Sequence, residues 1–183
     1  MTKAAELAKM GEVITNSQIG GRRNLIINGA MQVAQRSSSA VAVSDNSNEG
    51  YQSVDRMNFG FGSNAGGACN ISQDTTVPSG LGFSNSYKVD VTTADTSIDS
   101  THQIFFRTIL EAQDIRKSGW NYTDSTGNSK ITCSFYARSN KAGTYCFAFR
   151  SVDATGNMYY VKEFTLVADT WTRVIITIPS NSS

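Results

Sequence analysis

Charged residues are scarce in this sequence. Only 17% of its residues are Asp, Glu, Lys or Arg, and the formal net charge at pH 7 is +1. Proteins that bind nucleic acid concentrate Lys and Arg on one face to neutralise phosphates. Here Arg22-Arg23 is the only adjacent basic pair in the first half of the chain. The charge pattern therefore argues against a nucleic-acid-binding protein.

Long apolar runs are absent as well. A helix that crosses a membrane needs about 20 consecutive apolar residues, and no stretch approaches that length. The N-terminal segment carries Lys3, Glu6, Lys9 and Glu12 and lacks the continuous apolar centre of a secretory signal. We therefore expect neither membrane insertion nor signal-dependent export.

Cysteine and histidine are too few to build the usual frameworks and metal sites. The three cysteines, Cys69, Cys133 and Cys146, are too scattered for a disulfide framework. We expect free thiols, those of Cys133 and Cys146 buried in strands, and synthesis in a reducing cytoplasm. The single histidine, His102, cannot supply a multi-histidine site, and Cys-x-x-Cys spacing does not occur. The sequence predicts no metal and no cofactor.

Catalytic motifs are missing too. No nucleophile elbow of the form G-x-S-x-G is found. The stretch 60–65, GFGSNA, fits the form of a dinucleotide fingerprint, but that motif requires a strand that turns into a helix. A further strand-like run follows it here, so we interpret it as a turn. Glu111 and Asp114 lie in a short stretch of helical character, where solvation is the default. The sequence favours a non-enzymatic protein.

The chain begins with a pattern that predicts a helix. Over residues 2–14, good helix formers surround Leu7, Met10 and Ile14, which recur at spacings of three and four. A helix this short is marginal in isolation, so its apolar stripe needs a partner: the body of the same subunit, copies of itself or another protein. Gly20-Gly21 follows, and we expect an anchoring segment at 1–21 and a β-sandwich domain at 22–183.

From Asn24 onward the apolar residues alternate as in strands, and only 111–117 interrupts this with one or two helical turns. Short connections at 140–143, 153–157 and 168–169 predict hairpins that join the last four strands into an antiparallel meander. About nine strands indicate an all-β, antiparallel sandwich or barrel, of which we expect the sandwich. The loop 37–50 is expected to be exposed and mobile. The predicted strands are 24–34, 55–61, 68–73, 87–92, 102–109, 130–138, 144–151, 158–166 and 172–178.

Several aromatic residues are expected at loop or strand ends. Flat aromatic faces bind the apolar faces of sugar rings, and nearby Asn, Asp and Arg side chains hold the hydroxyls. Tyr51, Trp120, Tyr122 and Tyr159 therefore form the candidate glycan surface. The alternative is that Trp120 and Tyr122 simply cover one end of the sandwich. Asp55-Arg56, close to Tyr51, is expected to form a local ion pair.

Five segments taken in order resemble a known family. They are RNLIINGAMQVAQR, GYQSVDRMNF, SYKVDVTTAD, SKITCSFYARSNKAGTY and WTRVIITIP, which lie between residues 23 and 179. This arrangement resembles bacteriophage virion proteins of the tail-fibre or host-attachment type, frequent in phages of marine bacteria. Their sandwich is similar to jelly-roll carbohydrate-binding modules that open with an N-L-x-x-N-G strand. Met57 stands where the family has an aromatic residue, and relatives continue for further strands beyond the last segment.

The resemblance implies a structural, non-enzymatic component of a virion, made in the host cytoplasm. Leu7, Met10 and Ile14 would dock into the particle or associate with their copies, and a homotrimer is expected because phage fibres commonly trimerise. Other virion proteins and a host surface glycan are the expected partners. The alternatives are a capsid decoration or head-fibre protein, or a module that binds or degrades polysaccharide.

Overall fold

The computed structural model is rich in antiparallel strands, and its chain divides into two compact units. The first β-unit is Asn24–Glu111, and the second β-unit is Ala112–Ser183. Leu7, Met10 and Ile14 of the expected helix lie outside the described residues. Within the described part, no helix is long and apolar enough to cross a membrane. The structure describes residues 3, 24–45, 47–62, 66–121, 123–124, 126, 129–153 and 156–180.

The first β-unit contains five strands in a nested arrangement. β3 and β4 pair with each other, and so do the strands that flank them in sequence, β2 and β5. β1 adds to the other edge of β3, which gives a sheet of order β1-β3-β4 beside the β2-β5 ladder. The strands are β1 (Val41–Ser44), β2 (Asn58–Gly62), β3 (Ala68–Asp74), β4 (Ser86–Thr93) and β5 (Gln103–Arg107).

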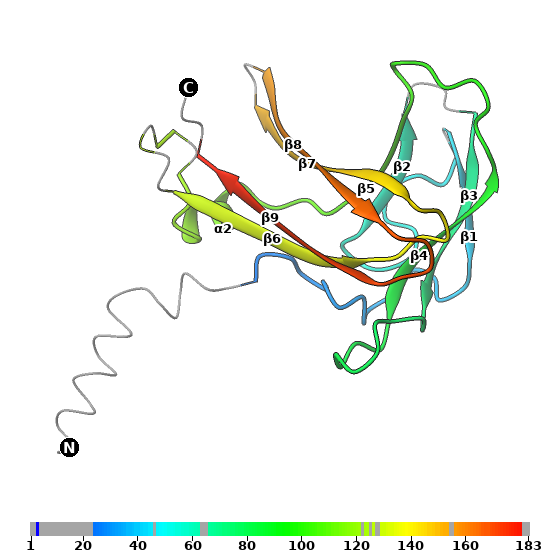
Figure 1. Cartoon of the computed structure of the whole chain (residues 1–183), viewed down its shortest axis with the longest axis horizontal. Coiled ribbons are helices and arrows are strands. Elements are labelled where there is room, and N and C mark those ends of the chain that lie inside the picture. The colour runs from blue at the N-terminus through cyan, green and yellow to red at the C-terminus, as the bar shows by residue number, and fades with distance from the viewer. Residues whose placement is uncertain are drawn as a thin grey trace. The chain divides into compact units, whose positions relative to one another are not determined.

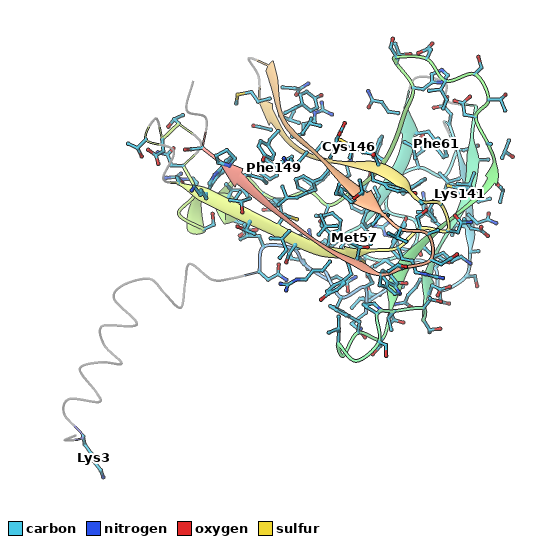
Figure 2. All side chains as sticks on the ribbon, in the orientation of Figure 1. Lys3, Met57, Phe61, Lys141, Cys146 and Phe149 are labelled. Atoms are coloured by element: carbon cyan, nitrogen blue, oxygen red, sulfur yellow. The ribbon has the colours of Figure 1, made fainter. Side chains whose placement is uncertain are left out.

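The core of this unit follows from strand alternation. Val43, Cys69 and Ile71 occupy one face of β1 and β3, and they pack against Phe59 and Phe61 of β2. All five side chains are at most 4% exposed. Phe61 is labelled on β2 in Figure 2. Complete burial of this kind contributes about 1.5–3 kcal/mol for each large apolar side chain.

Gly60 shows how tightly the β2-β5 ladder is packed. A Cβ at this position would lie 2.8 Å from the ring of Phe105, its partner across the ladder. Only glycine fits that approach without a shift of the ring. Gly60 and Gly62, the two glycines of the fingerprint-like stretch, therefore belong to a paired strand, and no phosphate loop is formed by them.

The second β-unit repeats the nested arrangement after a short helix, α2 (Ala112–Lys117). β7 (Gly143–Asp153) and β8 (Gly156–Leu166) form a hairpin. The flanking strands β6 (Lys130–Ala137) and β9 (Thr172–Pro179) pair with each other. Figure 1 shows these pairs as two ribbons. The helical turns predicted at 111–117 and the hairpin predicted at 153–157 are confirmed.

The predicted meander is wrong, because β6 and β9 do not pair with β7 and β8. The connections on both sides are corners at which the long hairpin folds over. Asp169, in the left-handed region at φ 57°, donates its N–H to the carbonyl of Ser139 at 2.7 Å. The Arg138 guanidinium donates to the Asp169 carboxylate at 2.8 Å. These contacts tie the two corner segments together and direct β7-β8 back over β6-β9.

The two ribbons of the second β-unit pack through aromatic and aliphatic side chains. The buried face of β9 presents Val174, Ile176 and Ile178. Partly buried partners from β6, β7 and β8 cover this face, among them Phe135, which lies 5.5 Å from Phe164 between ring centroids. Phe149 faces the same cluster, and Figure 2 labels it on β7.

Three further expectations are corrected. The stretch 24–34 is a series of turns, because Asn28 and Met31 adopt φ of 58° and 57°, which a continuous strand excludes. The first strand is β1, which lies in the loop expected to be mobile and buries Val43. Cys146 is exposed rather than buried, because β7 turns Phe147 and Phe149 inward. The three cysteines are free thiols, as predicted.

Candidate functional site

A polar groove of about 450 Å³ lies within the first β-unit. It contains Tyr51 from the predicted glycan surface, together with donors, acceptors and one apolar side chain. No local sequence motif indicates this groove, because its residues come from three separate segments. The groove is lined by Gln35, Arg36, Tyr51, Asp55, Arg56, Ile109 and Glu111.

Tyr51 is placed by the backbone immediately before it. The N–H of Gly50 donates to the carbonyl of Phe59 at 2.8 Å, and the Phe59 N–H donates back at 3.0 Å. Gly50 adopts φ 106°, a conformation that suits glycine. The Glu49 carboxylate accepts the N–H of Phe61 at 2.9 Å. This end of the loop is therefore fastened to the buried strand β2.

Asn28 links the segment before Gln35 to the Asp55-Arg56 turn. Its side-chain amide donates to the carbonyls of Val33 and Asp55, both at 2.9 Å, and its side-chain oxygen accepts the Val33 N–H at 3.1 Å. The Asp55 N–H also donates to the Val33 carbonyl at 2.9 Å. Asparagine tolerates the left-handed backbone that this turn requires. The Asn28-Gly29 pair thus orders the segment that leads to Gln35 and Arg36.

Arg56 has an unusual backbone conformation. Its φ is 68°, although a long side chain is disfavoured in the left-handed region. Val54 and Met57, on either side of the Asp55-Arg56 pair, are 0% and 2% exposed, and the Met57 N–H donates to the Val54 carbonyl at 3.2 Å. The buried neighbours hold the turn, while the Arg56 side chain stays exposed in the groove.

The groove combines complementary chemical groups. Arg36 and Arg56 offer only donors, the Asp55 carboxylate only accepts, and Gln35 and Tyr51 do both. Across the described residues, neither guanidinium forms an ion pair, and the local Asp55–Arg56 pair expected from the sequence is not formed. Such a surface matches a ligand that carries hydroxyl groups and acceptors around an apolar ring face.

The remaining aromatic candidates do not join Tyr51 in this groove. Trp120 packs on the core of the second β-unit, edge-on to Phe149 at 5.6 Å between centroids. Tyr159 is 58% exposed on the other face of the β7-β8 ribbon, beneath the Arg150 guanidinium at 5.5 Å. Tyr122 lies outside the described residues. Trp120 and Tyr159 therefore face opposite sides of one ribbon.

The single histidine lies in the corner of the first β-unit that connects β4 to β5. His102 Nδ1 lies 2.9 Å from Asp95 Oδ2, and that oxygen also accepts the Gly66 N–H at 3.2 Å. The N–H of Ser97, and after it His102 and Gly66, holds the pKa of Asp95 below its ordinary value. In the part of the chain that the structure covers, no group of three His, Cys, Asp or Glu side chains is arranged to hold a metal ion.

Sequence reasoning identified Tyr51 but missed Gln35, Arg36 and Glu111 as its neighbours. Arg36 and Glu111 are 75 positions apart in the chain, so only the fold brings them to one groove. Comparison of the chain with protein-family models, with curated proteins and with solved structures finds no match.

Proposed function

We propose that this protein is a non-enzymatic structural component of a bacteriophage virion, of the tail-fibre or host-attachment kind, which displays β-units that contact a host surface glycan. The groove at Tyr51 carries this proposal. It sets an aromatic ring among amide, carboxylate and guanidinium groups, the combination that orients a sugar by its ring face and its hydroxyls. Two fastened loops keep these groups in place before a ligand arrives.

The jelly-roll-like part of the proposal is supported by the nested hairpins. In each β-unit, an inner hairpin folds back over the pair of strands that flanks it in sequence. A jelly roll is also a double-sheet antiparallel fold. We propose that the strands of each unit form a jelly-roll-like fold, which displays its loops as host-attachment proteins do.

The anchoring part of the proposal rests on Leu7, Met10 and Ile14 in the sequence. We propose that residues 1–21 dock into the particle and that the protein assembles as a homotrimer. Exposed apolar side chains on strands support association: Val91 and Ile104 are 66% and 60% exposed. A capsid decoration or head-fibre role would need the same anchor and the same displayed units.

One observation favours a second candidate function. Asp55 and Glu111 both line the groove, and glycoside cleavage uses two carboxyl groups on either side of the scissile bond. A polysaccharide-degrading module is therefore the alternative from a different functional class. Sugar turnover would be lost in Asp55→Asn and Glu111→Gln variants if this alternative holds.

The proposed function is tested by glycan binding and by incorporation into particles. On a glycan array, the wild type should retain host-surface saccharides without releasing reducing ends, and Tyr51→Ala should lose most of the signal. Tyr159→Ala, which removes an exposed aromatic from the other unit, is the matched control and should bind as the wild type does. Released oligosaccharides would replace attachment by the degrading alternative.

Incorporation is tested with a chain that lacks residues 1–20. Its β-units should stay folded, while the truncated protein is absent from purified particles. Light scattering on the wild type and on a Leu7→Asp/Ile14→Asp variant should show a trimer and a smaller species. Particles that contain the truncated protein at the normal level would overturn the anchoring role.

A further inference from the structure

The backbone of Arg56 points to a specific use of its side chain. A non-glycine residue at φ 68° is held in an uncommon conformation, and such positions cost about 1 kcal/mol or more and cluster at binding sites. Glycine or asparagine would adopt this turn more easily. A contact between the guanidinium and a ligand would account for an arginine at this position.

Arg36 supplies a second guanidinium to the same groove from a separate segment of the chain. Both side chains are exposed, and within the described residues neither is neutralised by an ion pair. A guanidinium presents its N–H donors in a rigid fork that matches a carboxylate with two parallel hydrogen bonds. Charge-assisted hydrogen bonds of this kind are about twice as strong as neutral ones.

The acceptors in the groove define the remainder of the ligand. The Asp55 and Glu111 carboxylates accept hydrogen bonds but repel other carboxylates, so they suit hydroxyl groups. The Tyr51 ring suits the apolar face of a sugar. A ligand that satisfies all of these groups together carries hydroxyls, a ring face and an isolated acid group.

We propose that the groove binds an acidic saccharide, with the carboxylate of a uronic acid unit held by Arg56 and Arg36 and its ring placed on Tyr51. This inference rests on the proposed glycan contact at the same groove and names its chemical class. A neutral sugar would leave the two guanidiniums paired only with hydroxyls, which gives weaker hydrogen bonds than a carboxylate does.

The experiment compares sugars that differ only in the acid group. Trimers of galacturonate, glucuronate and mannuronate are titrated into the full chain beside the corresponding neutral trimers of galactose, glucose and mannose. At least one uronate should bind about tenfold more tightly than its neutral counterpart. This preference should shrink as salt is added, because exposed charges are screened.

Variants separate a direct contact from a general charge effect. Arg56→Gln and Arg36→Gln should each remove most of the uronate preference, and each should weaken binding of the uronate trimer more than binding of its neutral counterpart. Lys88→Gln removes an equal charge from an exposed position on β4, outside the groove, and should keep the preference. Arg56→Gly should lose it while the unfolding midpoint stays equal to or above that of the wild type, because glycine relieves the left-handed backbone.

The outcomes are distinguishable. Equal affinity for acidic and neutral trimers, both lost in Tyr51→Ala, overturns the acidic preference but leaves the glycan contact standing. The absence of binding to all six trimers and to the wider array overturns both. A uronate preference that survives in Arg56→Gln and Arg36→Gln shows that another part of the molecule holds the acid, and overturns this assignment.

Discussion

The two β-units share one topological plan but differ in how completely they are closed. In each, an inner hairpin folds over the ladder of its flanking strands. The first β-unit adds β1 and the fastened loops between residues 24 and 57, and Val54 and Ile71 are both 0% exposed. In the second, the most buried residue of the central cluster, Ile178, is 3% exposed, and its partners on β6, β7 and β8 are only partly buried.

This difference accounts for the position of the groove in the first β-unit. The ladders alone give two packed ribbons, as in the second β-unit, where Tyr159 lies on the exposed face. The added loops of the first β-unit are tied to its core by Gly50 and Asn28. Residues of those loops line the groove, so the contacts that tie the loops to the core also determine its shape.

The corners of the two units differ in their chemistry. The first uses a carboxylate with a histidine, Asp95 with His102, whose side chains are 10% and 16% exposed. The second uses Arg138 with Asp169, whose side chains are 35% and 63% exposed. The first pair depends on the ionised carboxylate of Asp95, whose pKa lies below its ordinary value, whereas an arginine stays charged at every ordinary pH.

The largest expected effect is that of a cavity in the better-closed core. Ile71→Ala should lower the free energy of unfolding of the first β-unit by about 2–5 kcal/mol. Labelling of Cys69, the only cysteine of that unit, should report the loss. Fluorescence of Trp120 and Trp171, both in the second β-unit, should keep its wild-type transition.

The matched control for this cavity is Ile104→Ala, because Ile104 is 60% exposed on β5. Its effect should stay within about 0.5 kcal/mol. Ile176→Ala in the second unit should fall near the lower end of the cavity range, since its half-covered surroundings can relax. A tryptophan transition that moves together with Cys69 labelling in Ile71→Ala would refute the separation into two units.

The reactivity of the three thiols gives a second comparison of burial in the two β-units. Burial raises the pKa of Cys69 to about 11, from an ordinary value of 9.0, so its thiolate fraction at neutral pH falls by about 100-fold. Burial also raises the pKa of Cys133, whereas Cys146 is exposed. Alkylation followed by mass spectrometry should modify Cys146 first, then Cys133, and Cys69 only as the first unit opens. Early modification of Cys69 would contradict the closed core.

The corners give the smallest expected effects. The lowered pKa of Asp95 means that its ionised form stabilises the fold above about pH 4, and this contribution is lost as the pH falls through the lowered value. Methyl NMR signals of Ile71 should show the first unit weakening in acid, and Asp95→Asn should flatten that slope. Arg138→Met should lower the stability of the second unit by only about 0.5 kcal/mol. A steep acid slope that Asp95→Asn leaves unchanged would assign the sensitivity to other carboxylates.

The strands of the second β-unit were the part of the fold most open to prediction. Strict alternation in 130–138 predicted β6 to within one residue, because one face of the strand is buried and the other is not. The pairing was not predictable in the same way. Whether a short connection closes a hairpin or bends one depends on contacts such as Arg138–Asp169, which join residues distant in sequence.

The candidate site was predictable only where one residue carries the signal. Tyr51 was found because it is an aromatic residue in a polar loop. Arg36 and Glu111 reach the groove through the fold, and the left-handed backbone of Arg56 is visible only in the structure. The failure at 24–34 has a local cause: Asn28-Gly29 was included in a strand although this pair is a turn signal.

The central claim is that the first β-unit holds the glycan site and that the aromatic residues of the second do not. An NMR titration of the full chain with the saccharide that binds best tests it directly. We expect shift changes at the side chains of Gln35, Tyr51 and Arg56, while the Trp120 indole and the Tyr159 ring stay unperturbed. Shifts centred on Trp120 or Tyr159, with the groove unchanged, would contradict it.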